Sequence, residues 1–443
     1  MGLVKIIDGS EFKTCFAGVS SGTADAEVNA VVSEIIAAVR AEGDTAVRRY
    51  ALRFEKETPE KFEVPIEVAK EAWELIKTAE PNLASSLVLA ADNIRHFAEL
   101  QKKQIVSFET EMTPGLIVGQ RVIPIDRAAI YAPGGRFPLI SSALMGLIPA
   151  AAAGVKEKIL VSPPAAGGLP NPRILAAAHL AGADRIFALG GAQAIAALAL
   201  GTETVPRVDF IAGPGNKYVA AAKRLLFGEV GIDFVAGPTD VLIITDTNAE
   251  TADLIAADML AQAEHDPDAR ARAIVPDKGM ALLVERALEK ELAWLPTAET
   301  ARASLEAGGL IIICKLRDEA ISIANEIAPE HLELQVSAPE EWILGLKNYG
   351  SLFIGALAAE VLGDYSAGIN HTLPTSTSAR FSGGLSVRHF LKTATTLRCA
   401  ASKDCAKAFK AAETIANAEG LIAHATSAAL RLPANYQDFK LDK

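Results

Sequence analysis

The fold class follows from the segment Ala128-Ala129-Ile130-Tyr131-Ala132-Pro133-Gly134-Gly135, an apolar run that leads directly into a Pro-Gly-Gly turn. A short apolar run without polar alternation is typical of a strand buried on both faces of a parallel sheet. The segment 141–153 that follows is rich in Ala, Leu and Met and predicts a helix. Residues 128–153 therefore form a strand, a tight turn and a helix, which is the repeating unit of α/β proteins.

The same alternation continues downstream. Further strands are expected at 159–164, 185–189 and 208–212, with helices at 174–181, 193–199 and 217–227 between and after them. Two more glycine turns follow strands, Gly190-Gly191 and Gly213-Pro214-Gly215. Ligands of parallel sheets bind outside the carboxyl ends of the strands, so these turns are candidate binding loops. None of them contains Gly-x-Gly-x-x-Gly, and the residues alone therefore name no cofactor.

A second α/β run begins near residue 241. Apolar strands at 241–246, 271–275, 310–314 and 351–355 alternate with helices, and helices are expected at about 24–103 and again at about 387–430. We therefore expect two Rossmann-like parallel-sheet domains with helical N- and C-terminal extensions. The expected boundaries are an N-terminal extension at 1–23, a first α/β domain at 24–128 plus 238–380, an inserted domain at 129–237, and a helical C-terminal arm at 381–443.

Composition excludes several classes of protein. The chain has 443 residues, of which 50% are hydrophobic and 22% are charged, and its net charge is −11. Because it has no lysine or arginine run, a nucleic-acid or membrane partner is not expected. No signal peptide or membrane-spanning segment is apparent, so we expect a cytoplasmic protein. The scattered cysteines predict neither a thiolate zinc site nor a disulfide framework; they are Cys15, Cys314, Cys399 and Cys405.

Two polar side chains lie three residues apart on the helix expected at 256–265. Gln262 and His265 would share one face of that helix and offer an oxygen and a nitrogen ligand to a cation, a set suited to zinc. Taken alone, a Gln-x-x-His pair is more typical of a solvated helix face. The pair supports a metal site only if other polar residues lie close to it in the folded protein.

Glu330 and His331 form the polar pair that most strongly indicates a catalytic role. They lie directly after a proline and before an apolar segment. A carboxylate beside an imidazole can divide acid–base work, because histidine exchanges protons near neutral pH. The alternative is an ordinary helix end at the surface. Asp364 lies in a Gly-flanked polar segment that is expected to be a loop, where aspartate serves as a turn former or as a metal ligand.

Together these stretches resemble the histidinol dehydrogenase family over about residues 28–431. The resemblance is carried by several ordered motifs, which are 131–135, 190–198, 213–219, 231–238, 262–265, 328–332, 363–365 and 370–375. It implies four-electron oxidation of L-histidinol to L-histidine through the aldehyde, with two NAD and one zinc ion. The implied zinc ligands are Gln262, His265, Asp364 and His424.

The resemblance also implies roles for other residues. His331 would be the general base, and Glu330 would activate the water that hydrates the aldehyde. NAD contacts would fall on Tyr131, Gln193 and Asn216, each at one of the three glycine turns. Substrate contacts would be His331 and the zinc ligands together with Thr239, His371 and Glu419. Family members are homodimers with exchanged C-terminal arms, so Glu419 and His424 would complete the neighbour's site.

Two departures from the family pattern bear on the substrate. Thr239-Asp240 replaces the usual Ser-Glu, and the first glycine turn continues as Arg136-Phe137-Pro138-Leu139. Related dehydrogenases of other alcohols, such as sulfopropanediol, often carry Thr at this position, although the Glu330-His331 motif is of the histidinol type. The sequence therefore predicts an NAD- and zinc-dependent alcohol dehydrogenase acting on L-histidinol or on another primary alcohol. A catalytically inactive binding protein is the alternative of a different class.

Overall fold

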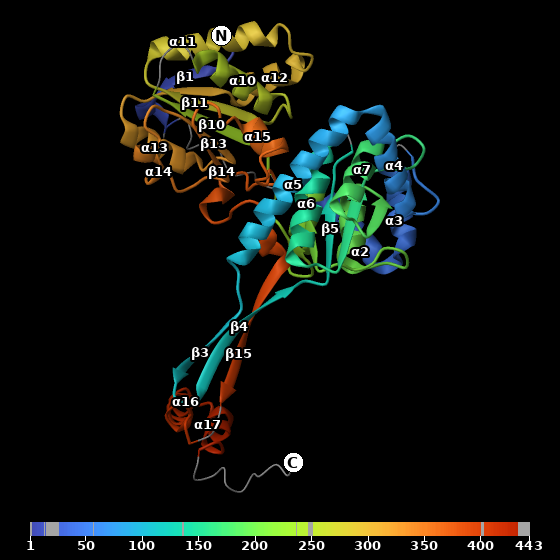
Figure 1. Ribbon diagram of the computed structural model, residues 1–443, viewed down its shortest axis with the longest axis vertical. Coiled ribbons are helices and arrows are strands. Elements are labelled where there is room, and N and C mark those ends of the chain that lie inside the picture. Colours follow the sequence, from blue (N-terminus) through green and yellow to red (C-terminus); the bar gives the residue numbers. More distant parts are fainter. Residues whose placement is uncertain are drawn as a thin grey trace. The chain divides into compact units, whose positions relative to one another are not determined.

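The computed structural model (Figure 1) describes residues 2–12, 14, 26–55, 57–134, 137–235, 237–246, 251–399 and 403–432. The chain divides into two compact units. Unit 1 comprises residues 1–100 and 125–390, and unit 2 comprises residues 101–124 and 391–443. The mixed α/β fold class expected from the sequence is confirmed, because two of the three sheets are built mainly of parallel strands.

The first sheet of unit 1 has six strands in the order β2-β7-β6-β5-β8-β9. Its strands are β2 (Glu63–Val64), β5 (Arg127–Tyr131), β6 (Glu157–Ser162), β7 (Arg185–Ala188), β8 (Phe210–Ala212) and β9 (Gly231–Ile232). All neighbours are parallel except β2, which runs antiparallel to β7. Because β6 and β8 lie on opposite sides of β5, the chain changes direction across the sheet between β5 and β8. In such sheets this is the place where ligands bind.

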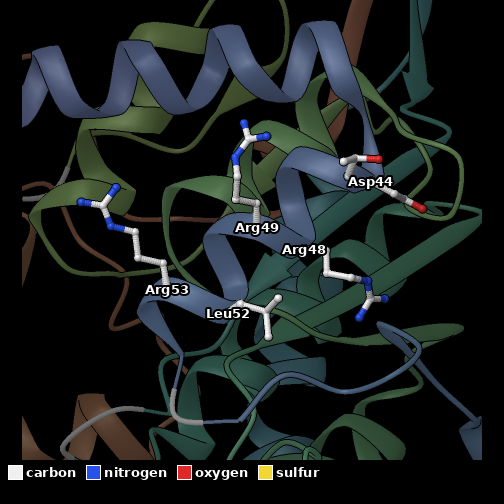
Figure 2. A pocket seen from close by; sticks show the side chains of 6 residues that line it. Asp44, Arg48, Arg49, Leu52 and Arg53 are labelled. Carbon is white, nitrogen blue, oxygen red and sulfur yellow. The ribbon is translucent and has the colours of Figure 1, made fainter.

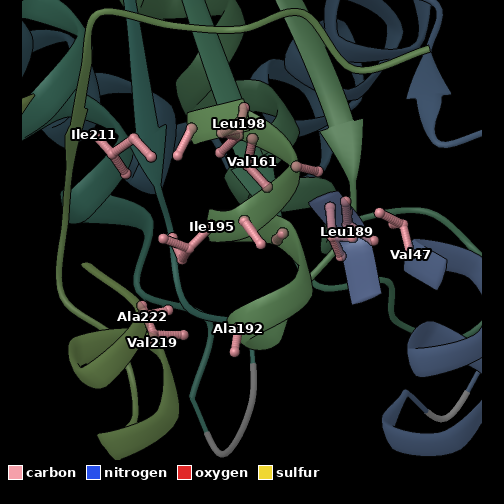
Figure 3. Close-up of a cluster of buried hydrophobic side chains, with 14 of the residues drawn as sticks. Val47, Val161, Leu189, Ala192, Ile195, Leu198, Ile211, Val219 and Ala222 are labelled. Carbon is pink, nitrogen blue, oxygen red and sulfur yellow. The ribbon is translucent and has the colours of Figure 1, made fainter. Parts of the chain in front are cut away.

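Helices cover both faces of the first sheet. α2 (Ala26–Glu42) packs against α8 (Gly191–Leu200) and α9 (Lys217–Leu226), and α3 (Asp44–Phe54) packs against α8. In Figure 3 the buried side chains of this face converge, with Val161 and Ile211 from the strands facing Ala192, Ile195 and Leu198 of α8. The remaining helices of this part are α4 (Ile66–Ala79), α5 (Pro81–Lys103), α6 (Ile140–Ala153) and α7 (Pro172–Ala181), and α7 contacts both α4 and α6.

The second sheet of unit 1 is wholly parallel, in the order β1-β12-β11-β10-β13-β14. Its strands are β1 (Lys5–Asp8), β10 (Asp240–Thr245), β11 (Arg270–Val275), β12 (Leu310–Ile313), β13 (His331–Gln335) and β14 (Ser351–Ile354). Alternate residues of β10 enter different cores, with Val241 and Ile243 on one face and Leu242 and Ile244 on the other. This explains why β10 reads as an unbroken apolar run: both of its faces are buried.

One face of the second sheet is covered by α10 (Ala252–Ala263), α11 (Lys278–Leu292) and α12 (Ala298–Gly308). The other face is covered by α13 (Arg317–Ile327) and α14 (Glu340–Ile343). A short helix, α15 (Glu360–Tyr365), follows β14, and contacts α10. Single 3₁₀ turns lie at η1 (Gly9–Glu11), η3 (Ser378–Arg380) and η4 (Val387–Phe390).

Unit 2 contains a three-stranded antiparallel sheet and two helices. β4 (Leu116–Pro124) lies between β3 (Phe108–Thr113) and β15 (Leu391–Cys399), and α16 (Ala406–Ala418) packs against α17 (Ile422–Ala429). A disulfide joins Cys399 to Cys405. The sequence did not predict this bond, because nothing in the spacing of the scattered cysteines indicated a pair.

The structure differs from the sequence expectation in two groupings. Residues 26–79 join the first sheet rather than the second, because β2 pairs with β7, α2 and α3 pack on α8, and α4 packs on α7. Residues 391–399 form a strand rather than a helix, because they pair along their whole length with β4. Within the described ranges, no helix is both long enough and apolar enough to cross a membrane.

Candidate active site in unit 1

His331 stands at the amino end of β13, deep in unit 1. Helix α13 ends at Ile327, and Ala328 takes a left-handed backbone conformation (φ 48°) that turns the chain back into the sheet. His331 then pairs with Val241 of β10. Its side chain is buried, as is that of Glu330. A non-glycine residue in the left-handed region is strained, and such strain is common where a chain must place functional groups.

The protonation state of His331 follows from its neighbours. Its Nδ1 atom lies 3.3 Å from the carbonyl oxygen of Asp240. Since a carbonyl can only accept, Nδ1 carries the hydrogen and the lone pair is on Nε2. Burial lowers the pKa of His331 to about 3, so the imidazole is neutral at physiological pH. Nε2 has no hydrogen-bond partner in the described part of the chain and is available to accept a proton.

Three carboxyl groups surround His331. Nδ1 lies 3.5 Å from an oxygen of Glu360 and 3.9 Å from an oxygen of Glu330, while Nε2 lies 3.8 Å from Oδ1 of Asp364. Burial raises the pKa of Glu330 and of Glu360 well above the usual value, and that of Asp364 to about 6. So many carboxyl groups in a buried space repel one another when ionised, and an added cation would relieve that repulsion.

Thr239 and Gln262 connect Glu330 to Glu360. The Thr239 hydroxyl donates to Oε2 of Glu330, and the Gln262 side chain lies 2.8 Å from the Thr239 oxygen. The other end of the Gln262 amide faces Glu360, at 2.9 and 3.3 Å from its two oxygens. If the amide nitrogen of Gln262 faces Glu360, it donates a hydrogen bond to the carboxylate. If the amide oxygen faces Glu360 instead, two acceptors meet, and a proton or a cation must lie between the amide oxygen and the carboxylate oxygens.

The residues fit a divalent cation. Ligand atoms of His331, Glu360 and Asp364 all lie within 4.8 Å of one another. Gln262 faces Glu360, and the charge of His265 acts on Asp364 by lowering its pKa, so both are close to this cluster. If Nε2 of His331 is kept as a proton acceptor, the imidazole of His265 with the carboxylate of Asp364 and the amide oxygen of Gln262 is a donor set that zinc accepts.

The predicted metal ligands are therefore divided between the units. Gln262, His265 and Asp364 lie in unit 1, with Asp364 on helix α15 rather than in the loop that the sequence predicted. His424 lies on α17 of unit 2, and Glu419 ends α16. Both are exposed. The predicted substrate contact His371 belongs to the unit 1 cluster, since its Nδ1 lies 3.1 Å from the carbonyl oxygen of Asp364.

Sequence reasoning missed Glu360. It lies four residues before Asp364 on α15, so the two carboxylates share one helix face. That spacing was a usable signal. It was obscured by glycines at 355, 363 and 368, which made the whole segment resemble a loop.

A cavity of about 610 Å³ opens beside this cluster. His265 and Tyr365 form part of its wall, and mostly apolar residues, including Phe137, Leu139 and Leu144, form much of the rest. The hollow in Figure 2 is a different surface, lined by Asp44, Thr45, Arg48, Arg49, Leu52 and Arg53 of α3. Arg48 there donates to the carbonyl oxygens of Pro59 and Glu60, and Arg49 pairs with Glu42. Because these guanidinium groups already have partners, we place the active site beside His331.

The predicted cofactor contacts lie at the carboxyl edge of the first sheet. Tyr131 ends β5, and its hydroxyl accepts from the backbone N–H of Gly191 at 3.2 Å. Gln193 lies in α8, where it donates to Glu55 at 3.2 Å. Asn216 caps α9 by accepting from the N–H groups of Tyr218 and Val219. Of the three expected glycine turns, Gly190-Gly191 follows β7 and Gly213-Pro214-Gly215 follows β8, whereas Gly135 of the first turn lies outside the described residues.

The turn after β8 requires glycine at 213. Its φ is +114°, and a Cβ atom there would collide with the carbonyl oxygen of Tyr131. Its N–H donates to Asp233 at 2.8 Å and its carbonyl accepts from Lys223 at 3.0 Å. A buried ion pair between Lys223 and Asp233 therefore fixes both sides of this peptide.

Comparisons with known proteins agree on one family. A family model described as histidinol dehydrogenase matches residues 20–432. Histidinol dehydrogenase of Methylococcus capsulatus is 45% identical over 93% of this chain and 93% of its own length. The enzyme of Thermus thermophilus is 45% identical over 92% of this chain and 95% of its own. The crystal structure of histidinol dehydrogenase from Elizabethkingia anophelis, 33% identical, superposes with a TM-score of 0.91 and covers 99% of this chain and 100% of that one.

Proposed function

The chain belongs to the histidinol dehydrogenase family, and from this premise we propose that it oxidises L-histidinol to L-histidine through the aldehyde, as a step of histidine biosynthesis. Two NAD molecules would be reduced for each substrate molecule, and one zinc ion would be bound. The observation that carries the proposal is the free Nε2 of a neutral His331 beside Asp364 and the Gln262–Glu360 pair. A proton acceptor next to a cation-binding cluster is what oxidation of an alcohol requires.

His331 would act as the general base. Its Nδ1–H is held by the Asp240 carbonyl, so the ring is oriented and Nε2 faces the space beside Asp364. From there it would take the hydroxyl proton of the alcohol and, in the second half of the reaction, that of the aldehyde hydrate. Each of these proton transfers accompanies the departure of a hydride from the same carbon, which NAD accepts.

Glu330 would serve the hydration step between the two oxidations. Its carboxyl accepts from the Thr239 hydroxyl and from the N–H of Asp240 at 3.2 Å, which holds it in place. The raised pKa of Glu330 makes the group a better proton acceptor from water than an exposed carboxylate, once it is ionised. Thr239 would orient Glu330 and contact the substrate.

The metal would be held by Gln262, His265 and Asp364, with His424 supplied from unit 2 of a second copy. A bound zinc ion would anchor the substrate's nitrogen atoms and hold its reacting carbon in position. Glu360 and His371 would support this set, Glu360 through Gln262 and His371 through the Asp364 carbonyl.

NAD would bind at the carboxyl edge of the first sheet, against Tyr131, Gln193 and Asn216. This placement is supported by the change of direction between β5 and β8, because ligands of such sheets bind at that point. We also propose a homodimer in which Glu419 and His424 reach the partner's site. A cytoplasmic location, like the dimer, is an expectation from the sequence.

A second candidate is a family member that oxidises another primary alcohol, such as sulfopropanediol. Two observations favour it: Thr239 in place of serine beside Glu330, and Phe137 in the wall of the 610 Å³ cavity. Purified protein with zinc and NAD should be assayed for NADH formation on L-histidinol and on sulfopropanediol in parallel. We expect two NADH for each L-histidinol consumed. Activity on sulfopropanediol alone would establish the second candidate and reject the first.

A further inference from the structure

The first sheet has the topology of a dinucleotide-binding fold but lacks its usual acidic residue. In such folds an Asp or Glu after the second strand accepts hydrogen bonds from a ribose of the cofactor. The corresponding strand here is β6, which lies next to β5 and ends at Ser162; Pro163 and Pro164 follow it. None of these three residues carries a carboxylate. A ribose bound at this edge would need its acceptor from another element.

Glu55, which directly follows α3, supplies a carboxylate at this edge. Its Oε1 atom accepts from the N–H of Gly190 at 2.7 Å and from the amide of Gln193 at 3.2 Å. Its Oε2 atom is buried and has no hydrogen-bond partner within the ranges that the structure describes. One half of the carboxylate therefore fixes the glycine turn, while the other half is left to accept from a ligand.

The surroundings of Glu55 are those of the proposed cofactor site. Gly190 is the N-cap residue of α8, and the next N–H, that of Gly191, donates to the Tyr131 hydroxyl. A Cβ atom at Gly190 would come 2.8 Å from the ring of Pro163, so the end of β6 lies against the same turn. Glu55 thus lies beside two of the three proposed NAD contacts and beside the position where the usual acidic residue is missing.

We propose that Glu55 is a specificity-determining residue whose Oε2 accepts a ribose hydroxyl of NAD and repels the 2′-phosphate of NADP. The inference rests on the proposed use of NAD and adds the residue that selects it. A role confined to holding the Gly190 turn is the alternative. It would require only Oε1 and would leave the preference between the two dinucleotides unchanged.

Glu55→Gln separates the two roles, because glutamine keeps an oxygen for the Gly190 N–H and removes the charge. NAD and NADP should be titrated calorimetrically into the full-length zinc-loaded protein, without substrate. We expect the variant to bind NAD about tenfold more weakly, the usual cost of losing a hydrogen bond to a charged group. We expect the ratio of its affinity for NAD to its affinity for NADP to be smaller than in the wild type. Glu57→Gln is the matched control, since that carboxylate also accepts from a glycine N–H, that of Gly167 at 2.7 Å.

The outcomes are distinguishable. A Glu55→Gln protein with the wild-type affinity for NAD and the wild-type preference overturns the inference and leaves the proposed function intact. Wild-type protein that binds neither dinucleotide overturns the proposed function as well. If Glu55→Gln does not fold, Glu55→Ser is the second variant, and it should gain affinity for NADP. Wild-type protein that binds NADP as tightly as NAD overturns the inference without any variant.

Discussion

The Nε2 atom of His331 lies 3.8 Å from Oδ1 of Asp364, across the space between strand β13 and helix α15. This distance is too long for a hydrogen bond and leaves both atoms facing the same small volume. The proposed base and a proposed metal ligand are therefore neighbours. His331 would therefore accept a proton from a substrate group that is bound beside Asp364.

The proposed role of His331 predicts a specific kinetic defect. His331→Asn keeps a polar side chain but removes the proton acceptor, so turnover should fall by roughly two to four orders of magnitude. Affinity for NAD should remain that of the wild type, because the proposed cofactor contacts lie at the first sheet. Steady-state NADH formation and calorimetric NAD titration measure the two quantities. His179→Asn, on α7, is the control, and unchanged turnover in His331→Asn would remove the residue from the mechanism.

A buried carboxyl group behind the site predicts a dependence of stability on pH. Burial raises the pKa of Glu333 from 4.5 to about 8. The folded protein therefore keeps a proton that the unfolded chain has lost, and stability is fully present below pH 4.5 and is lost as pH rises through 8. Glu333→Gln imitates the protonated form, so its melting temperature relative to wild type should be higher at pH 9 than at pH 5. The same difference at both pH values would contradict this.

Much of the architecture was predictable because it depends on local patterns. The apolar runs of β5, β6, β10 and β12 alternate with helices, and each formed a buried parallel strand. The Gln262–His265 pair was expected on one helix, but α10 ends at Ala263, and His265 lies in the turn that follows it. The periodicity of apolar residues does not indicate which other strand a given strand pairs with. Residues 391–399 form β15 only because β4, some 270 positions earlier, pairs with them.

The candidate-site residues that belong to a sequence motif were predictable. The contacts that form only between residues distant in sequence were not. Glu330 and His331 are adjacent in sequence and stayed together in the structure. Glu55 is 135 residues from Gly190, and Glu360 is 98 residues from Gln262, yet each pair is in contact. Such pairs arise from packing between elements, about which a single sequence carries no direct signal.

The ion pair of Lys223 with Asp233 predicts a large loss of stability when one partner is removed. Both side chains are almost wholly buried, and together they fix the Gly213 peptide. Lys223→Met leaves an uncompensated buried carboxylate, which should cost about 3–5 kcal/mol of unfolding free energy in urea titrations. Lys156→Met removes an exposed pair with Asp126 and should cost less than about 1 kcal/mol. Equal losses in the two variants would contradict a special role for the buried pair.

The proposed exchange of C-terminal arms predicts complementation between two inactive variants. His265→Ala removes a proposed metal ligand within unit 1, and His424→Ala removes the ligand proposed to come from the partner. In a mixed dimer with crossed arms, the His424→Ala chain keeps its own His265 and receives an intact His424, so one of the two sites carries neither lesion. Equal mixing with free exchange should then restore about a quarter of wild-type activity, because half of the dimers are mixed and each has one intact site. If His424 instead serves its own chain, every site keeps one lesion, and no activity returns even when subunit exchange is demonstrated by mixing differently tagged chains.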